Sequence, residues 1–322
     1  MLTTKLLRLA SSAIAAVAIM TTGAFAQDDY PNKSVTLIIP LGAGGSHDLN
    51  ARVFTSIIPQ YLGQPVVVKL MPGASGQTGT AAAARARPDG YTLLFTHNYF
   101  DQLQQYITKL PYDTFKDFET VAMLNSASSC VATKSGRPYK TWEEMIAYAR
   151  ANPGKIEMAH SGQWGAGMVH SAQIMKIYGI RFNLTPYPGG GPAMKALLAD
   201  DADMTTGFPI TITTVGSGVY PLACGAASEA IPADTPIYGK DIPELAGVGD
   251  MQRIVMAPAG VPAERIAKLR EAFQQLKEDK TFQSLMSKLG EDTNVMDGPD
   301  YEKVRAKQAN DYKELVEDLT KG

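Results

Sequence analysis

Residues 34–48 read SVTLIIPLGAGGSHD, a short apolar run that leads into a loop rich in glycine. After the loop, Leu49, Val53 and Ile57 recur at helical spacing. Glycines allow the backbone to turn tightly, and Ser46 is a favourable N-cap for a helix. The stretch therefore predicts a strand, a loop and a helix. Such a loop presents backbone N–H groups and the positive end of a helix dipole to an anion, and an ordinary strand-to-helix turn is the alternative that the loop alone leaves open.

The first 26 residues have the pattern of a signal peptide. Lys5 and Arg8 form a positive region, residues 9–20 are apolar, and Ala24-Phe25-Ala26 precedes Gln27 as a cleavage site. The apolar run is too short to span a bilayer, although an uncleaved membrane anchor is an alternative. We therefore expect an exported, periplasmic protein.

Composition argues against two kinds of partner. The chain has 30 Lys and Arg against 32 Asp and Glu, so it has no basic surplus that would bind nucleic acid. Its four histidines are scattered, and neither they nor Cys130 and Cys224 have the spacing of a metal site. The sequence predicts no nucleic-acid partner and no metal or other cofactor. In an oxidising compartment the two cysteines can form a disulfide.

Strand-like and helix-like runs alternate along most of the chain, which predicts an α/β fold with parallel strands covered by helices. Two further glycine-rich loops follow strand-like runs, at residues 160–167 and 186–192. Residues 204–258 are expected to be largely irregular, and two helices are expected to close the chain, from Pro262 and over residues 301–319. Two such α/β units suggest two lobes that face a cleft.

The glycine-rich loops carry no motif of nucleotide binding or catalysis. Residues 42–48 lack the Lys-Ser/Thr of a Walker A loop and the spacing of a dinucleotide-binding turn. The chain also lacks a Gly-x-Ser-x-Gly elbow. An enzyme on the same fold is the alternative, but the sequence favours a protein that binds a ligand without changing it.

Motifs spread along the chain resemble those of a known family, the Bug-type substrate-binding proteins of tripartite tricarboxylate transporters. They are Tyr30-Pro31, Gly44-Gly45-x-x-Asp48, Leu62-Gly63-Gln64-Pro65-Val66, Pro72-Gly73-Ala74-x-Gly76, Pro88-Asp89-Gly90-Tyr91-Thr92-Leu93, Leu110-Pro111-Tyr112-Asp113, Ala151-Asn152-Pro153-Gly154-Lys155, Ser161-Gly162, Pro186-Tyr187, Gly189-Gly190-Gly191-Pro192-Ala193 and Ala257-Pro258-Ala259-Gly260-Val261-Pro262. Each motif alone is weak evidence for the family, but the whole set in this order is specific to it.

The resemblance implies a type II periplasmic-binding-protein fold, with two α/β lobes and a ligand cleft between them. Residues 27–123 and 229–322 would form lobe I, and residues 124–228 lobe II. It also implies a monomer that captures a small organic anion for the membrane subunits of a secondary transporter. A ligand sensor that docks on a sensor kinase is the alternative role.

In the family, two loops hold one carboxylate of the ligand through backbone N–H groups, hydroxyls and water. The matching loops here are Pro40–Asp48 and Ser161–Gly167. The residues that the resemblance implies for ligand binding are Leu41, Gly42, Ala43, Gly44, Gly45, Ser46, Asp48, Ser161, Gly162, Gln163, Trp164, Gly165, Ala166 and Phe208.

The chain departs from the family in the second loop and after Asp203. Gln163 and Trp164 stand where relatives usually carry Ser or Thr, and Gly207-Phe208 replaces a common Asp-Asn. The missing acidic residue argues against an amino-acid ligand. Trp164 and Phe208, with Tyr99 and Phe100, suggest an apolar or aromatic distal pocket, and packing is the alternative for each. The expected ligand is a dicarboxylate, a tricarboxylate or an aromatic acid.

Overall fold

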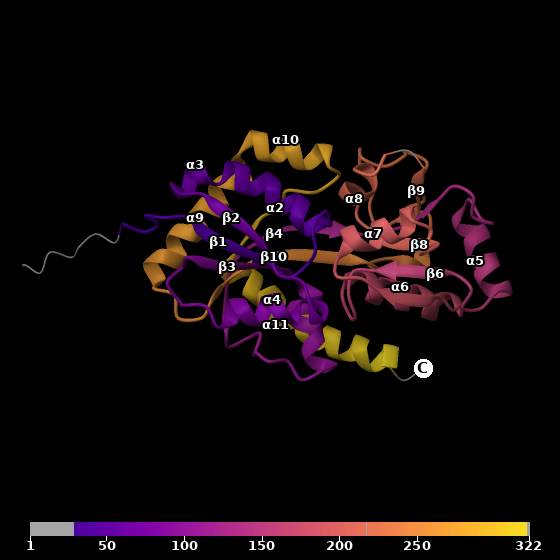
Figure 1. The fold of residues 1–322 in the computed structure, drawn as a ribbon, viewed down its shortest axis with the longest axis horizontal. Helices are drawn as coiled ribbons and strands as arrows, with labels where there is room; N and C mark the ends of the chain where they lie inside the picture. The colour runs from indigo at the N-terminus through magenta and orange to yellow at the C-terminus, as the bar shows by residue number, and fades with distance from the viewer. Residues whose placement is uncertain (1–28, 217, 321–322) are drawn as a thin grey trace, which may run out of the picture.

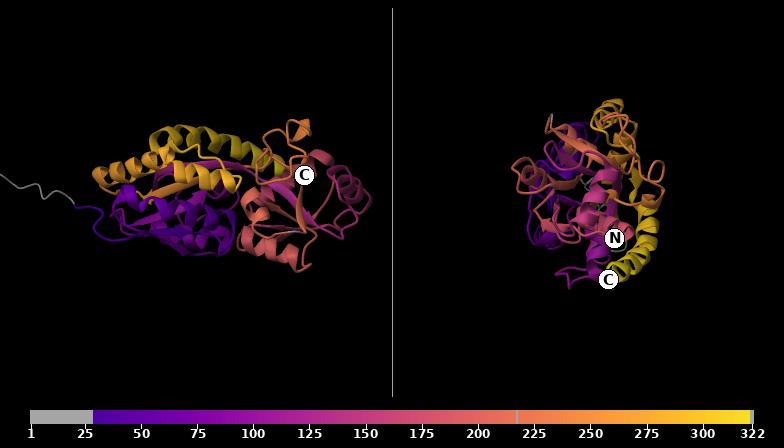
Figure 2. Two further views of the ribbon diagram at one scale, coloured as in Figure 1. Left: turned by 90° about the horizontal axis from the view of Figure 1, so that it is seen from above. Right: turned by 90° about the vertical axis from the view of Figure 1, so that its right-hand side faces the viewer.

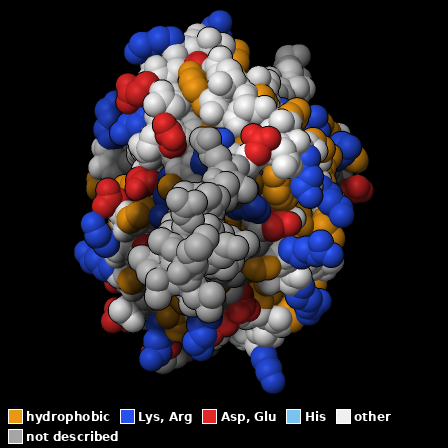
Figure 3. All heavy atoms as spheres, turned by 90° about the vertical axis from the view of Figure 1, so that its left-hand side faces the viewer, with side chains coloured by type: hydrophobic (Ala, Val, Ile, Leu, Met, Phe, Trp, Pro, Cys, Tyr) orange, Lys and Arg blue, Asp and Glu red, His pale blue; other side chains and the backbone are white. Residues whose placement is uncertain are grey.

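The computed structural model describes residues 29–216 and 218–320, which form two lobes side by side (Figure 1). The predicted signal peptide, residues 1–26, lies outside the described residues. Within the described ranges, no helix has the length and apolar character needed to cross a membrane. Basic and acidic side chains are intermixed over the face shown in Figure 3.

Lobe I is built on a six-stranded mixed sheet. Its strands, in spatial order, are β11 (Met296–Asp297), β4 (Phe118–Ser128), β10 (Asp250–Pro258), β3 (Thr92–His97), β1 (Val35–Ile39) and β2 (Val66–Leu70). Strands β2 and β3 both pair in parallel with β1, as the alternation of the sequence predicts. Strand β10, which comes late in the chain, lies between β3 and β4 and pairs antiparallel with both.

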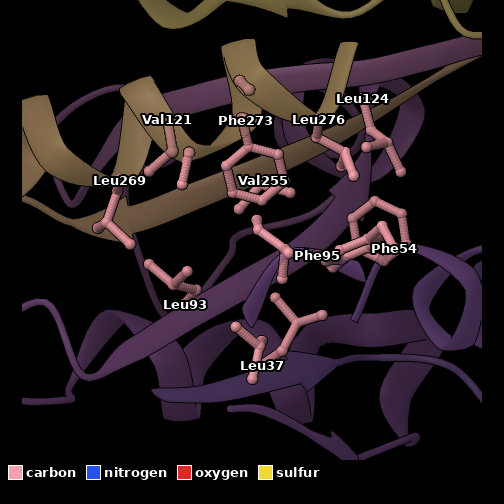
Figure 4. Close-up of a cluster of buried hydrophobic side chains, with 14 of the residues drawn as sticks. Leu37, Phe54, Leu93, Phe95, Val121, Leu124, Val255, Leu269, Phe273 and Leu276 are labelled. Atoms are coloured by element: carbon pink, nitrogen blue, oxygen red, sulfur yellow. The ribbon is translucent and has the colours of Figure 1, made fainter. Parts of the chain in front are cut away.

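The core of lobe I packs helices against this sheet. Leu37, Phe95 and Val255 point from three neighbouring strands toward Phe54 and Phe273 on two helices, and all five side chains are buried (Figure 4). The helical elements of lobe I are α2 (Ser46–Ile57), α3 (Pro59–Leu62), η1 (Ala74–Gly76), α4 (Gln77–Ala84), η2 (Tyr99–Leu103), η3 (Gln104–Tyr106), α9 (Ala263–Glu278), α10 (Lys280–Lys288) and α11 (Gly298–Thr320).

Lobe II has a five-stranded mixed sheet and its own core. The strands, in spatial order, are β7 (Asn183–Pro186), β6 (Glu157–His160), β8 (Met204–Gly207), β5 (Cys130–Lys134) and β9 (Val219–Cys224). The helical elements are α5 (Trp142–Ala151), α6 (Ala166–Tyr178), α7 (Gly190–Leu198), α8 (Pro209–Thr213) and η4 (Pro243–Leu245). Two α/β lobes on two sheets confirm the predicted fold class.

The chain crosses between the sheets where β4 ends and β5 begins, at Ser129, and returns between β9 and β10. At the first residue of β5, Cys130 forms a disulfide with Cys224, its register partner on β9, which confirms the predicted pairing. The long helix α11 lies along lobe I and reaches lobe II (Figure 2), where Asp318 pairs with Lys176 of α6. The boundaries expected at 123/124 and 228/229 stay a prediction.

Two expectations about the second half of the chain are wrong. The described part of residues 204–258, expected to be irregular, contains β8, α8, β9 and β10. The first three have only four to six residues each, and β9 contains Pro221, so no clear periodicity marks them. The chain also closes with α9, α10 and α11 rather than with two helices, because the Asp279 carboxylate accepts from the Phe282 N–H and starts α10 separately.

Candidate functional site

A small cavity lies between the lobes, where the carboxyl ends of strands from both sheets meet. Lobe I lines it with Leu41, Gly42, Gly45, Ser46, His47, His97 and Met251, and lobe II lines it with Ser161, Gly190, Thr206, Gly207, Phe208 and Thr211. Its volume is about 20 Å³, which is room for about one water molecule. The lobes are therefore closed on each other, and an organic acid enters only when they part.

A second cavity, of about 180 Å³, adjoins the first and shares Leu41 and Ser161 with it. Its other walls come from the segment Gly73–Gly76, Phe100, Gly162 and the segment Pro186–Pro188. The cleft between the lobes thus consists of a small inner cavity and a larger outer one.

The first glycine-rich loop brings the start of helix α2 to the inner cavity. Gly45 precedes the helix in an extended conformation and, among the described residues, no side chain caps the first turn. Asp48 instead accepts a hydrogen bond from the N–H of Gly44 at 2.8 Å and pairs with Arg52. Asp48 thereby holds the loop in shape, and the first N–H groups of α2 stay available to an anion.

The third glycine-rich loop meets the first across the cleft. The N–H of Gly42 donates to the carbonyl oxygen of Pro188 at 2.7 Å. A Cβ placed on Gly45 would lie 3.2 Å from the nitrogen of Gly191, which is in the first turn of α7. Helix α7 also starts without a side-chain cap among the described residues. The starts of α2 and α7, one from each lobe, therefore approach the same cavity.

The second glycine-rich loop is held against lobe I at the outer cavity. The N–H of Gln163 donates to the hydroxyl of Ser75 at 3.0 Å. Trp164 has a φ of 54°, a left-handed conformation that is rare for a tryptophan. Its half-buried side chain joins a cluster with Tyr99 and Phe208. Phe208 lines the inner cavity, whereas Trp164 lies outside that lining.

Two histidines, His47 and His97, line the lobe I side of the inner cavity, and Arg253 lies beside them outside the lining. Arg253 is fully buried, lies opposite His97 in the β10–β3 register, and makes a two-pronged ion pair with Glu291 at 2.7 and 3.1 Å. Burial, reinforced by the charge of Arg253, lowers the pKa of His97 to about 3. Burial, with His97 and Arg253 nearby, also lowers the pKa of His47 well below its usual value. Both imidazoles are therefore neutral at physiological pH.

The structure brings part of the predicted set to the two cavities. Of the described residues, those that were predicted and that line a cavity are Leu41, Gly42, Gly45, Ser46, Ser161, Gly162 and Phe208. The predicted residues that lie outside both linings are Ala43, Gly44, Asp48, Gln163, Trp164, Gly165 and Ala166. These include the loop residues that shape the backbone, so the role of each in ligand binding stays a prediction.

Sequence reasoning missed several residues of the inner lining. They are His47, His97, Thr206, Gly207, Thr211 and Met251. A signal existed for two of them, since His47 lies within the first glycine-rich loop and His97 ends a parallel strand, at the sheet edge where ligands bind.

The described residues give little support for a metal site or for a catalytic serine. Among residues 29–216 and 218–320, no group of three or more His, Cys, Asp or Glu side chains is arranged to hold a metal ion. Ser129 and His170 form a hydrogen bond of 2.6 Å, but both side chains are buried where the chain crosses between the lobes. That serine therefore meets no substrate.

Known proteins share both sequence and fold with this chain. The family model described as "Tripartite tricarboxylate transporter family receptor" matches residues 50–320. A Cupriavidus necator protein, "UPF0065 protein in gbd 5'region", is 29% identical over 315 residues, covering 96% of this chain and 94% of the relative. The structure of the periplasmic binding protein BugD is 27% identical with a TM-score of 0.82, covering 90% of this chain and 98% of BugD.

A more distant structure shows the same fold. MatC from Rhodopseudomonas palustris with bound malate is 22% identical with a TM-score of 0.80, covering 89% of this chain and 100% of MatC. The family match spans most of the chain, from within α2 to the end of α11, and includes the second and third glycine-rich loops. This protein belongs to the tripartite tricarboxylate transporter receptor family, the Bug-type periplasmic solute-binding proteins.

Proposed function

We propose that this protein, as a monomer in the periplasm, captures a small organic carboxylate between its lobes and delivers it to the membrane subunits of a tripartite tricarboxylate transporter. The observation that carries the proposal is the approach of two helix starts, α2 and α7, to one cavity from opposite lobes. Both helices lack a side-chain cap among the described residues, so their first N–H groups suit an anion.

The polar groups around the inner cavity favour a carboxylate over a phosphate or a cation. Ser46, Ser161 and Thr206 add hydroxyl donors to the backbone N–H groups. The lining includes no lysine or arginine among the described residues, and dipoles with neutral donors are enough for one singly charged group. Arg253 lies behind the lining and adds positive charge, largely offset by Glu291.

The relatives support this class of ligand. The matched family is one of transporter receptors, and MatC, of the same fold, holds the dicarboxylate malate. Phe208 in the inner lining presents an apolar surface that an apolar part of the ligand can contact beside the carboxylate. Dicarboxylates, tricarboxylates and aromatic acids are therefore the compounds to test.

A thermal-shift screen of the purified protein against these acids tests the proposal. A ligand at one hundred times its dissociation constant adds about 2.7 kcal/mol to the free energy of unfolding, which raises the melting temperature measurably. Recovery of the ligand chemically unchanged distinguishes binding from catalysis. If the protein responds to no carboxylate but does respond to amines or sugars, the proposal fails.

Replacement of Gly45 by valine tests where the carboxylate binds. A Cβ at Gly45 points across the cleft toward Gly190 and Gly191 of α7, so a branched side chain blocks the site without entering a core. We expect binding to be lost while the melting temperature of the unliganded protein changes little. An unchanged affinity would exclude the α2 start as the carboxylate site.

A further inference from the structure

We propose, on the basis of the function above, that His97 and His47 recognise a hydroxyl group on the ligand. The site then prefers hydroxycarboxylates over acids of the same carbon skeleton without the hydroxyl. His97 is thus a specificity-determining residue that the glycine-rich loops alone do not reveal.

The two imidazole rings lie side by side on the lobe I face of the inner cavity. His47 comes from the first turn of α2 and His97 from the last residue of β3, and their ring centres are 5.2 Å apart. Nε2 of His47 is 3.2 Å from the carbonyl oxygen of Thr96, and a carbonyl only accepts, so this nitrogen carries the proton. Nδ1 of the neutral His47 is then a hydrogen-bond acceptor.

His97 offers a polar atom that the described protein does not satisfy. Its Nδ1 is buried and has no hydrogen-bond partner among the described residues, and the same holds for the hydroxyl oxygen of Thr206 on the lobe II face. Both side chains line the inner cavity. A buried polar atom without a partner costs free energy, and a ligand group that pairs with it recovers that cost. The unpaired nitrogen of His97 therefore offers a pairing site for a polar ligand group on the lobe I face.

A hydroxyl fits this subsite better than a second charged group. The lining of the inner cavity includes no Asp, Glu, Lys or Arg among the described residues, so a neutral hydroxyl is buried there at a lower cost than a second charged group. A hydroxyl both donates and accepts, so it pairs with His97 in either tautomer. A second carboxylate in the same space would lose its hydration to neutral partners, which is unfavourable.

Charge considerations also exclude an amino group at this subsite. The lining of the inner cavity contains no Asp or Glu among the described residues, so an ammonium would be buried without a counter-charge. Two buried carboxylates on that side are already paired, Glu291 with Arg253 and Asp48 with Arg52. Because Arg253 and burial keep both imidazoles neutral, the subsite stays a neutral hydrogen-bonding one across the physiological pH range.

Calorimetric titration with matched acids tests this preference. The probes are malate against succinate and lactate against propionate, with aspartate as the amino counterpart of malate. We expect the wild type to bind each hydroxy acid at least 10-fold more tightly than its partner without the hydroxyl, and to bind aspartate more weakly than malate. This magnitude corresponds to leaving one buried polar group unpaired.

Two substitutions assign the preference to His97. His97→Phe keeps a ring of similar size without polar atoms, and we expect it to reduce the hydroxyl preference to within about 2-fold while succinate binding persists. His97→Gln keeps a donor and an acceptor and should retain part of the preference. Thr206→Val, on the other lobe, removes the second unpaired atom and should weaken the preference separately.

The outcomes separate this inference from the proposed function. Equal affinity of the wild type for malate and succinate overturns the hydroxyl subsite but leaves carboxylate capture intact. An undiminished preference in His97→Phe also overturns the assignment to His97. If that variant does not fold, an undiminished preference in His97→Gln does so instead. Absence of binding by every carboxylate overturns the proposed function itself.

Discussion

The backbone N–H of Gly42 donates a hydrogen bond of 2.7 Å to the carbonyl oxygen of Pro188, and this contact joins the first glycine-rich loop of lobe I to the third one of lobe II. Next to it the two backbones pack directly on each other. A Cβ on Gly191 would lie only 2.1 Å from the carbonyl oxygen of Ala43, and one on Gly189 would lie 2.8 Å from the nitrogen of Gly42. The closed arrangement therefore depends on the absence of side chains at this contact.

Replacement of Gly191 by alanine should prevent full closure. Alanine favours the helix in which Gly191 lies, so lobe II itself should fold at least as well as in the wild type. The added methyl group collides with lobe I only when the lobes close. We expect the affinity for the bound carboxylate to fall at least 10-fold and the radius of gyration with ligand, from small-angle scattering, to stay at the open value.

Gly190→Ala is the matched control for this variant. It introduces the same methyl group one residue earlier in α7, where the nearest atom of the other lobe is 3.8 Å away, an ordinary contact. Its affinity should stay within about 2-fold of the wild type. Equal losses of affinity in the two alanine variants would contradict the role assigned to the contact between these loops.

The buried ion pair of Arg253 and Glu291 should be far more sensitive to mutation than an exposed one. Both side chains are fully buried, and Glu291→Gln leaves the arginine charge without a counter-charge. We expect a loss of about 3–5 kcal/mol in the free energy of unfolding, measured with urea. Asp300→Asn, which breaks an exposed pair with Lys303, should change it by less than about 1 kcal/mol. Similar effects of the two substitutions would contradict the burial of the pair.

The histidine at position 97 should make the protein less stable in acid. Its pKa is about 3 in the folded protein, mainly because of burial, and about 6.5 in an unfolded chain. Below pH 6.5 His97 binds a proton in the unfolded chain but stays neutral in the folded protein. The contribution of His97 to the free energy of unfolding is therefore highest above that pH and declines as the pH falls toward 3. The decline amounts to about 1.4 kcal/mol per pH unit.

Comparison with His97→Gln isolates this contribution from other titrating groups. The difference in free energy of unfolding between wild type and variant should shift in favour of the variant as the pH falls from 6.5 to 4.5. Urea unfolding of both proteins across this range measures the shift. A difference that does not depend on pH would mean that His97 titrates normally in the folded protein.

Tryptophan fluorescence should report on the cleft through one residue. Trp142 lies in the core of lobe II, where it packs against Tyr178 and Tyr238. Trp164 packs with Phe208, which lines the inner cavity, and its loop contacts lobe I through Gln163. We expect a ligand-induced change in emission that persists in Trp142→Phe and disappears in Trp164→Phe. A change that follows Trp142 instead would contradict this placement.

The affinity of a Trp164→Ala variant addresses the predicted aromatic pocket. If Trp164 contacts the ligand, the variant should bind an aromatic acid several-fold more weakly than the wild type and citrate equally well. If Trp164 serves only to support Phe208, all acids should change affinity by the same factor. Titration of both acids into wild type and variant decides between these outcomes.

The sequence by itself predicted the features that depend on residues close to one another along the chain. The run before Gly42 forms β1 and the residues after the loop form α2, as expected from local backbone chemistry. The alternation of strands and helices predicted two α/β lobes. The signal-peptide pattern predicted an oxidising compartment, in which Cys130 and Cys224 can form the disulfide that the structure shows. The family motifs predicted two cleft loops, and both contribute residues to the cavities.

The tertiary structure alone decided which residues meet across the cleft. His97 and Arg253 are neighbours only because β10 returns from lobe II to pair with β3, and no local pattern encodes that pairing over 150 residues of chain. The same holds for Gly42 and Pro188, which approach when two separately folded lobes close. The side chain of Trp164 packs against a cluster that includes Tyr99 of η2 and Ile210 of α8, two segments far apart in the chain. Strand-to-helix loops follow from short-range sterics, whereas the inner surface of the cleft depends on contacts between distant segments.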